Sequence, residues 1–431
     1  MIVGEQGQVL LMDKIETSGH KRLLSNTIAV YAMRFAMYVF PLITTPFLTR
    51  VLHENNYGIY SWTNAIISYA RLFIDFGFVV YGVEAIALCR ESKEECGKIV
   101  GLIIKYKAIL CLMTGVALSV LCMIRNDFRE YTIMLFISFL PGIVSVFNID
   151  YLFQGLEKMQ YITARIVVTK AIFTGMVLVF IRRPEQYLLI PIFTAVSDCL
   201  SVLLMFKNMR DMGIKPQKTC LIEGINILKK SSWFFYSRIS GAVYSYGNTI
   251  LIGMSFSKAD VAQYNIAYTL MVILQNLITP LSESLYPYMV KNHDFKLLKR
   301  LIIIFEPIIV LGCIIAFILA PWGIPFVFGA EYTTAPSIFR VMLLMVIIAL
   351  PEYLMGFPTL SALGKFKEPN IAVIIAGSMH VIGLCLIYYM GMISIVNIVL
   401  LTFITELLVM VIRGYFVYIA KKELVNKSEI V

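Results

Sequence analysis

Residues 28–42, IAVYAMRFAMYVFPL, form an apolar run that carries one arginine, Arg34, near its middle. In a water-soluble protein this run would be an awkward core helix, because arginine is almost never fully buried unless it is paired. In a helix that crosses a bilayer, an ionised side chain at this depth indicates a functional site. The composition of the whole chain therefore decides how Arg34 is interpreted.

The composition is that of an integral membrane protein. Of the 431 residues, 59% are hydrophobic and only 15% are charged, and the mean hydropathy is +0.80. Crossing the hydrocarbon layer takes about 20 apolar residues per helix. We therefore predict an all-α, polytopic membrane protein with about twelve transmembrane helices, at residues 25–48, 59–81, 99–124, 131–153, 161–181, 187–207, 231–255, 262–285, 299–320, 337–359, 369–390 and 393–418.

The distribution of lysine and arginine predicts the orientation of the chain. These residues are far more numerous in the N-terminal segment, the even-numbered loops and the C-terminal tail than in the odd-numbered loops. By the positive-inside rule, both termini are expected in the cytoplasm of a bacterial cell whose inner membrane holds the protein. The same asymmetry accounts for the net charge of +10, so no nucleic-acid partner is needed to explain it.

The two halves of the sequence resemble each other. Placing residues 25–35 above residues 229–239 brings Arg34 over Arg238, and the same offset matches Tyr60 with Tyr264. Two six-helix units that both enter from the cytoplasm are related by an axis along the membrane normal, an arrangement that builds a central cavity.

This repeat predicts the domain organisation of the chain. The expected parts are a cytoplasmic N-terminal extension (1–24), an N-lobe (25–207), a cytoplasmic inter-lobe linker (208–230), a C-lobe (231–420) and a cytoplasmic tail (421–431). The short patch VLLM in the extension is followed by charged residues instead of a cleavage site, so the extension is not predicted to be a secretory signal.

Three motifs carry a family resemblance. The stretch TRVLHENNYGIYSW (49–62) resembles the R-x-L-x-x-x-x-Y-G-x-Y signature of bacterial polysaccharide flippases, which export repeat units of O-antigen and capsule. DYLFQGLEKM (150–159) is similar to their aromatic-x-F-Q-G-x-E motif, and FVFGAEYTTAPSIFR (326–340) is similar to F-G-x-x-Y-x-x-A. The chain departs from the pattern at His53, where the family usually has glycine, and at Tyr151, where it often has tryptophan.

The resemblance implies a fold and a substrate. The superfamily also contains MATE-type multidrug exporters and the lipid II flippase. The implied substrate is an undecaprenyl-pyrophosphate-linked oligosaccharide that moves from the inner to the outer leaflet by alternating access. Membrane lipids, and a polysaccharide polymerase with its chain-length machinery, are the implied partners of a transport unit that is expected to be a monomer.

Ionised side chains inside the predicted helices are the candidate site residues. An arginine at the bilayer centre costs roughly 2.5–3.5 kcal/mol on insertion scales, so these side chains should face a wet cavity or a partner. Guanidinium groups stay ionised and match phosphate oxygens, which suits a pyrophosphate. The cations predicted to bind it are Arg34, Arg71, Lys170 and Arg238, and the acids predicted to couple transport to an ion or to balance charge are Asp75, Asp198 and Glu352.

Several of these residues also have simpler interpretations. Asp75 lies four residues after Arg71, so the two can form a salt bridge on one helix face. Lys107 is expected to extend to the membrane interface, and Arg413 to be solvated near the predicted cytoplasmic end of its helix. The candidate sugar contacts Tyr38, Tyr69, Tyr244 and Asn248 can equally serve as interfacial anchors or in helix packing.

The sequence contains no catalytic or metal-binding motif. It lacks the GxxxxGK[ST], HExxH and GxSxG patterns, so no nucleotide hydrolysis, enzymatic activity, cofactor or metal is predicted. A membrane glycosyltransferase would also need larger loops outside the membrane. The alternative to a flippase is a cation-coupled multidrug antiporter of the same fold, but an exporter of cations should have mainly acids in its cavity, and here cations are in excess.

Overall fold

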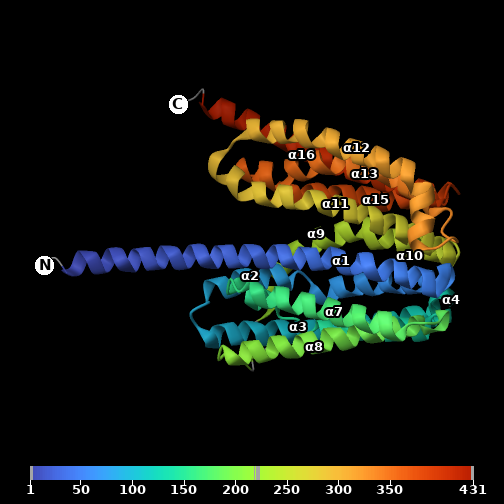
Figure 1. Cartoon of the computed structure of the whole chain (residues 1–431), viewed down its shortest axis with the longest axis horizontal. Coiled ribbons are helices and arrows are strands. Elements are labelled where there is room, and N and C mark those ends of the chain that lie inside the picture. The colour runs from blue at the N-terminus through green and yellow to red at the C-terminus, as the bar shows by residue number, and fades with distance from the viewer. Residues whose placement is uncertain (1–2, 218, 220–223, 429–431) are drawn as a thin grey trace. The chain divides into compact units, whose positions relative to one another are not determined.

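The computed structural model describes residues 3–217, 219 and 224–428, and these fold into helices and short connections (Figure 1). No strand occurs among them. In the first half the helices are α1 (Val3–Asp75), α2 (Phe78–Leu88), α3 (Lys93–Ile124), α4 (Asn126–Glu130), α5 (Thr132–Ser145), α6 (Asp150–Gly155), α7 (Met159–Phe180), the 3-10 segment η1 (Pro184–Leu188) and α8 (Leu189–Asp211).

The second half contains α9 (Ile225–Ala242), α10 (Asn248–Ser255), α11 (Lys258–Asn292), α12 (Phe295–Phe328), α13 (Ala335–Leu354), α14 (Leu360–Ala362), α15 (Glu368–Tyr389) and α16 (Ile395–Ser428). Two π-helical segments join neighbouring helices: η3 (Val243–Gly247) joins α9 to α10, and η4 (Met355–Thr359) joins α13 to α14.

The helices confirm the prediction of an all-α, polytopic membrane protein. Within the described residues, nine helical segments are long and apolar enough to cross a membrane. One of them, Ala32–Leu88, holds most of the first predicted span and all of the second, whereas the seventh and eighth predicted spans are not among the nine. The count of twelve is consistent with this arrangement and stays a prediction.

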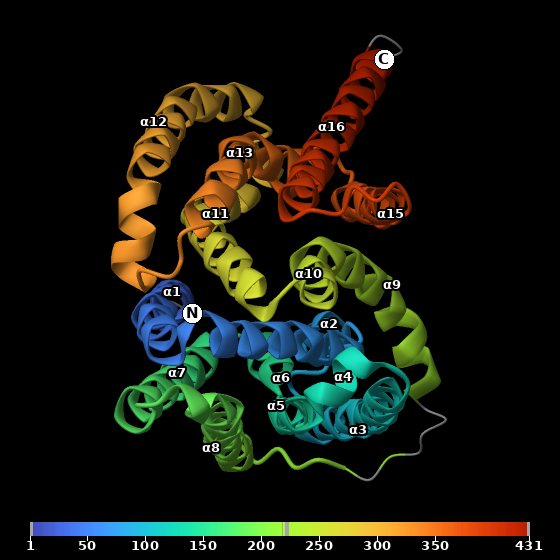
Figure 2. The ribbon, with the colours of Figure 1, turned by 90° about the vertical axis from the view of Figure 1, so that its right-hand side faces the viewer.

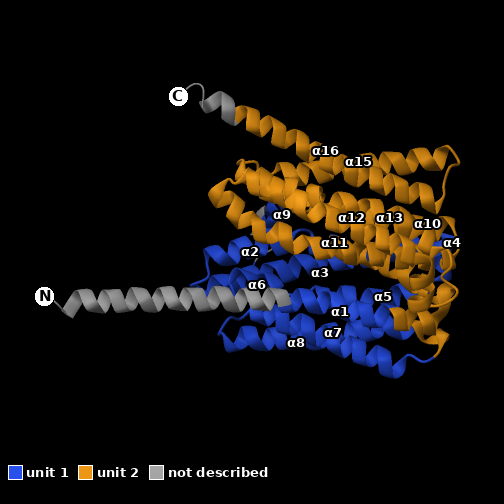
Figure 3. Ribbon diagram, turned by 45° about the horizontal axis from the view of Figure 1, so that its top comes forward, with its two compact units in different colours: residues 1–45, 73–182, 188–232 blue, residues 46–72, 183–187, 233–431 orange. Residues whose placement is uncertain are grey.

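The chain forms two compact units (Figure 3). Unit 1 contains residues 1–45, 73–182 and 188–232, and unit 2 contains residues 46–72, 183–187 and 233–431. Residues 46–72, the end of the first predicted span and the start of the second, thus belong to the same unit as the second half of the chain. The predicted lobe and linker boundaries are drawn from the repeat instead and stay predictions.

Two breaks bend the chain near its start. His53 lies inside α1 with φ 58° and ψ 170°, a backbone conformation that is essentially restricted to glycine. This explains why the flippase pattern has glycine at the position of His53. Phe76 and Gly77, both with positive φ, then separate α1 from α2.

In unit 2, α13 is the central helix. It packs against α11, α12 and α16, and Figure 2 shows it between α12 and α16. Of the most hydrophobic window of Ala335–Ala362, 56% is buried, against 6% for α12. Because the most apolar window of α12 is hardly covered by protein, its exposed side is suited to face lipid.

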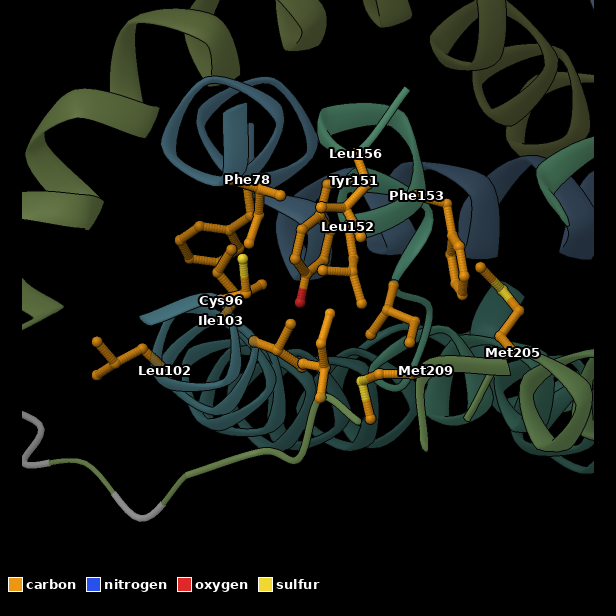
Figure 4. Packing of buried hydrophobic residues seen from close by; sticks show 14 of the residues in the cluster. Phe78, Cys96, Leu102, Ile103, Tyr151, Leu152, Phe153, Leu156, Met205 and Met209 are labelled. Atoms are coloured by element: carbon orange, nitrogen blue, oxygen red, sulfur yellow. The ribbon is translucent and has the colours of Figure 1, made fainter. Parts of the chain in front are cut away.

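A hydrophobic core in unit 1 surrounds the DYLFQGLEKM motif. Tyr151, Leu152 and Phe153 of α6 are fully buried there, among side chains of α2, α3 and α8 that include Phe78, Ile103, Met205 and Met209 (Figure 4). The motif glycine allows the short helix to approach α2. A Cβ added at Gly155 would lie 2.7 Å from the Cβ of Ile86 and 2.9 Å from the carbonyl oxygen of Val83.

We predict that Gly155→Ala lowers the melting temperature of the detergent-solubilised protein. Its methyl group would force α6 away from the α2 backbone, and overpacking of this kind typically costs about 1–3 kcal/mol. The matched control is Gly175→Ala in α7, where a Cβ would have nothing within 4 Å and alanine should be neutral or stabilising. Equal melting temperatures for Gly155→Ala and the parent would contradict the close-approach explanation.

Candidate functional site

The four cations predicted to bind pyrophosphate are divided between the two units. Arg34 on α1 and Lys170 on α7 are half-buried in unit 1. In unit 2, Arg71 near the end of α1 is half-buried and Arg238 on α9 is exposed. Each unit thus contains two of these cations. That Arg34 and Arg238 face each other remains a prediction from the repeat.

The helix that carries Arg238 is held firmly against α15. The Ser237 hydroxyl donates a hydrogen bond to Asn370 Oδ1 at 3.1 Å. One turn further along, a Cβ on Gly377 of α15 would lie only 2.6 Å from the Ser240 carbonyl oxygen. These contacts fix the position of α9. Arg238 is an exposed residue on this helix, and a fixed helix is a suitable support for a binding group.

Asp75, one of the predicted coupling acids, forms an ion pair with Lys107 of α3. The Lys107 ammonium lies 2.7 Å from Asp75 Oδ1, and the side chains are 1% and 28% exposed. An ammonium so deeply buried requires its counter-charge. The second predicted acid, Asp198, is half-buried on α8 in the same unit.

Unit 2 contains a buried polar cluster at the third predicted acid, Glu352. Its members come from η3, α10, α11, α13, α15 and α16, and are Tyr244, Asn248, Gln275, Glu352, His380, Thr402, Thr405, Glu406 and Arg413. Arg413 Nη1 donates to Glu352 Oε1 at 3.1 Å, and the two side chains are only about a tenth exposed. Gln275 Nε2 donates to Glu406 Oε2, also at 3.1 Å.

A hydrogen-bonded chain extends the polar cluster around His380, which is fully buried. His380 contacts Thr405 Oγ1 at 2.7 Å through Nδ1 and Asn248 Oδ1 at 3.0 Å through Nε2. The Asn248 amide nitrogen donates to Thr402 and to the Tyr244 carbonyl oxygen. Both polar atoms of the Asn248 side chain are therefore occupied inside unit 2, and in this conformation neither is available to a sugar.

The other candidate sugar contacts are partly accessible. Tyr38 in unit 1 and Tyr69 and Tyr244 in unit 2 are half-buried. The Tyr244 ring meets the His380 ring edge-on, with centroids 6.0 Å apart. Tyr244 and Asn248 are thus brought together with Glu352 in the polar cluster, while Tyr38 and Tyr69 lie elsewhere on α1.

The two family motifs assigned to unit 2 meet each other. His53 Nδ1 lies 3.2 Å from Glu331 Oε1, and Arg50 donates to the carbonyl oxygens of Phe326 and Val327. The Tyr332 hydroxyl donates to the Thr49 carbonyl oxygen, and its burial raises the pKa of this tyrosine. The motifs therefore join the turn after the first predicted span to the connection between α12 and α13.

Two expectations about charged residues were wrong. Lys107 and Arg413 are both buried and paired, and neither reaches the interface. The physical reason is that the helices continue past the apolar runs: α3 begins at Lys93 and α16 ends at Ser428, well beyond the predicted ends. Depth counted from hydropathy therefore places both side chains too close to the surface.

A pocket of about 550 Å³ lies in unit 1 at the end of α8, and it is a different feature from the predicted site. Its lining is basic and apolar: Phe206, Lys207, Met209, Arg210, Ile214, Lys215 and Pro216. None of the predicted site residues contributes to it.

Comparisons with known proteins identify the family. Residues 23–293 match the model of the family described as polysaccharide biosynthesis protein. A relative from Escherichia coli (strain K12), named "Putative O-antigen transporter", is 24% identical over 62% of this chain and 64% of its own length. A relative of the same name from Shigella dysenteriae is 27% identical over 85% of this chain and 93% of its own length.

Solved structures show the fold. An inward-facing multidrug resistance transporter of the MATE family, within the MOP superfamily, matches with a TM-score of 0.68 and 12% identity, covering 91% of this chain and 99% of that one. The lipid II flippase MurJ, in an inward closed conformation, matches with a TM-score of 0.68 and 13% identity, covering 91% and 87%.

By their names these proteins are transporters and a flippase and not enzymes. They confirm the prediction from the sequence that the chain is not an enzyme. The resemblance carried by the three motifs is confirmed as well. The chain belongs to the polysaccharide biosynthesis protein family, and it has the fold of the MATE transporters and of MurJ.

Proposed function

We propose that this protein flips a lipid-linked oligosaccharide across the cytoplasmic membrane for the assembly of a surface polysaccharide such as O-antigen or capsule. The observation that carries the proposal is the match to the O-antigen transporter relatives, one of which is aligned over 85% of this chain. The family assignment and the fold shared with a lipid II flippase support it. The substrate is an oligosaccharide repeat unit on undecaprenyl pyrophosphate, moved from the inner to the outer leaflet by alternating access.

The cations explain how such a substrate is held. Arg34 and Lys170 in unit 1, and Arg71 and Arg238 in unit 2, bind the pyrophosphate, because charge-assisted hydrogen bonds from ionised donors to phosphate oxygens are strong. Tyr38, Tyr69 and Tyr244 provide ring faces for the sugars, while the polyprenyl tail stays in the bilayer. Affinity must remain moderate, since the headgroup has to be released on the outer side.

The multidrug antiporter remains the second possibility for this fold. The MATE transporter and MurJ match equally well by TM-score, 0.68 in both cases, so the fold does not favour either activity. The sequence relatives do favour one, because both are O-antigen transporters by name. Glycan export by a complemented deletion strain, set against drug efflux by the same strain, separates the two.

The setting of the proposed activity is inferred from the charge distribution of the sequence and from the family resemblance. The protein acts as a monomer in the inner membrane, with both termini in the cytoplasm and with the polymerase and its chain-length machinery as partners on the outer side. Reporter fusions at the C-terminus test this orientation. Identifying the lipid-linked glycan that accumulates in the deletion strain identifies the substrate.

The pyrophosphate model predicts that Arg34→Ala and Arg238→Ala each reduce surface glycan at least tenfold without reducing the amount of protein in the membrane. Hydrogen bonds to charged groups are each worth about 1.5–3 kcal/mol, and lysine, which keeps the charge, should retain part of the activity. The matched control is Arg125→Ala, because Arg125 is a surface residue paired with Asp127 and 51% exposed. Normal export by the Arg34→Ala/Arg238→Ala double variant would defeat the model.

A second prediction separates structure from coupling at Asp75. Asp75→Asn should destabilise the solubilised protein by about 3 kcal/mol, the low end for a broken buried pair because Asp75 is 28% exposed. The double variant Asp75→Asn/Lys107→Met removes both charges and should regain the parental melting temperature. If the role of Asp75 is only structural, the double variant also regains glycan export. A stable double variant without export would instead assign Asp75 to coupling.

A further inference from the structure

The polar cluster of unit 2 contains one carboxylate more than its cations can balance. Glu352 is paired with Arg413. Glu406, on the same helix as Arg413, is 9% exposed and accepts a hydrogen bond from the neutral amide of Gln275. Among the described residues no ion pair involves Glu406, and the charged group that acts on it is Glu352, which has the same sign.

The groups around Glu406 offer no other compensation. Four tyrosines of η3, α11 and α13 lie close enough to Glu406 to interact with it electrostatically. They are Tyr244, Tyr264, Tyr268 and Tyr353. Phenols are neutral near pH 7. From α15, His380 contacts Thr405, the residue before Glu406, but its two nitrogens are engaged with Thr405 and Asn248. An ionised Glu406 would thus be a buried charge without a partner, which costs several kcal/mol.

A proton fits this site better than a metal ion does. A hard metal ion needs several oxygen atoms directed at one point. Here N–H donors already point at the carboxylates, from Gln275 to Glu406 and from Arg413 to Glu352. No group of three or more His, Cys, Asp or Glu side chains able to hold a metal ion occurs in the described part of the chain. A single proton neutralises the surplus charge and requires no further ligand.

The polar cluster also lies beside two departures from regular helix geometry. Tyr244 belongs to the π-helical segment η3, and Glu352 comes three residues before the π-helical segment η4. In η4, Gly356 has ψ −126°, and a Cβ there would lie 3.2 Å from Arg413 Nη1. The Arg413 guanidinium, which pairs with Glu352, thus packs against the irregular backbone of η4. Short π-helical segments are frequent at functional sites, where a helix can bend.

We propose that Glu406 is a proton-binding site, occupied in this conformation, and that release of its proton bends the helices at η3 and η4. While the proton is bound to Glu406, Arg413 forms an ion pair with Glu352 alone. After the proton leaves, two buried carboxylates compete for this one guanidinium, whose Nε is buried and has no hydrogen-bond partner. Arg413 then shifts against η4. The coupling of this change to substrate movement rests on the proposed flippase function, whereas proton binding itself does not.

The first test measures the proton without any substrate. At neutral pH, the infrared spectrum of the purified, full-length protein should contain the C=O stretch of a protonated carboxylic acid. Glu406→Gln should remove this band, since glutamine mimics the protonated acid and preserves the contact with Gln275. The matched control is Glu423→Gln, which lies on the same helix but is paired with Lys365 at the surface and 53% exposed. If the spectrum of Glu406→Gln keeps the carboxylic-acid band of the parent unchanged, the proposal is overturned.

The second test uses the protein reconstituted in vesicles, with the lipid extract of the deletion strain as the probe. The parent and Glu423→Gln should release protons into a weakly buffered medium when the extract is added, and Glu406→Gln should release none. Equal release by Glu406→Gln, or a response that depends on sodium and not on pH, would contradict the coupling role. If Glu406→Gln does not fold, Glu406→Asp keeps the carboxyl group and must shift the frequency of the carboxylic-acid band in the infrared spectrum.

The two proposals can fail separately. An infrared band assigned to Glu406 together with drug efflux instead of glycan export would reject the flippase function and keep the proton site. Glycan export without a protonated Glu406 would reject the proton site and keep the flippase function.

Discussion

The constraint on which this structure depends is that a charge inside the membrane needs a partner, a proton or water. An unpaired ion in a medium of low dielectric constant loses its hydration, and the loss amounts to several kcal/mol even after relaxation. The chain meets this constraint in two ways. Asp75 and Lys107, and Glu352 and Arg413, are joined as ion pairs between helices that are distant in sequence. Arg238 instead keeps its guanidinium exposed on a braced helix.

The motifs that carry the family resemblance make contacts that hold the fold together. Gly155 of DYLFQGLEKM lets α6 touch α2. Arg50 and His53 of the first motif contact the residues around Glu331 in the third.

Sequence periodicity and hydropathy predicted the helices well, since an apolar run of about 20 residues has few other structures available to it. They predicted the depth of the charges less well. α16 continues to Ser428 because polar residues outside the membrane extend a helix as readily as apolar ones do. Arg413 was therefore placed near a surface that lies further along the helix. Nor does one sequence reveal that Lys107 pairs with Asp75, because partners on different helices leave no mark in the spacing of either helix.

Arginine and glutamate differ in whether they can lose their charge. Arginine stays protonated at every physiological pH, so in the proposed mechanism Arg34 and Arg238 would not release a pyrophosphate by losing their charge. Under that proposal, release would come from movement of the cations away from the phosphate or from a change of charge elsewhere. A carboxyl group can supply that change, and Glu406 is a buried carboxyl of unit 2 for which no ion pair occurs among the described residues.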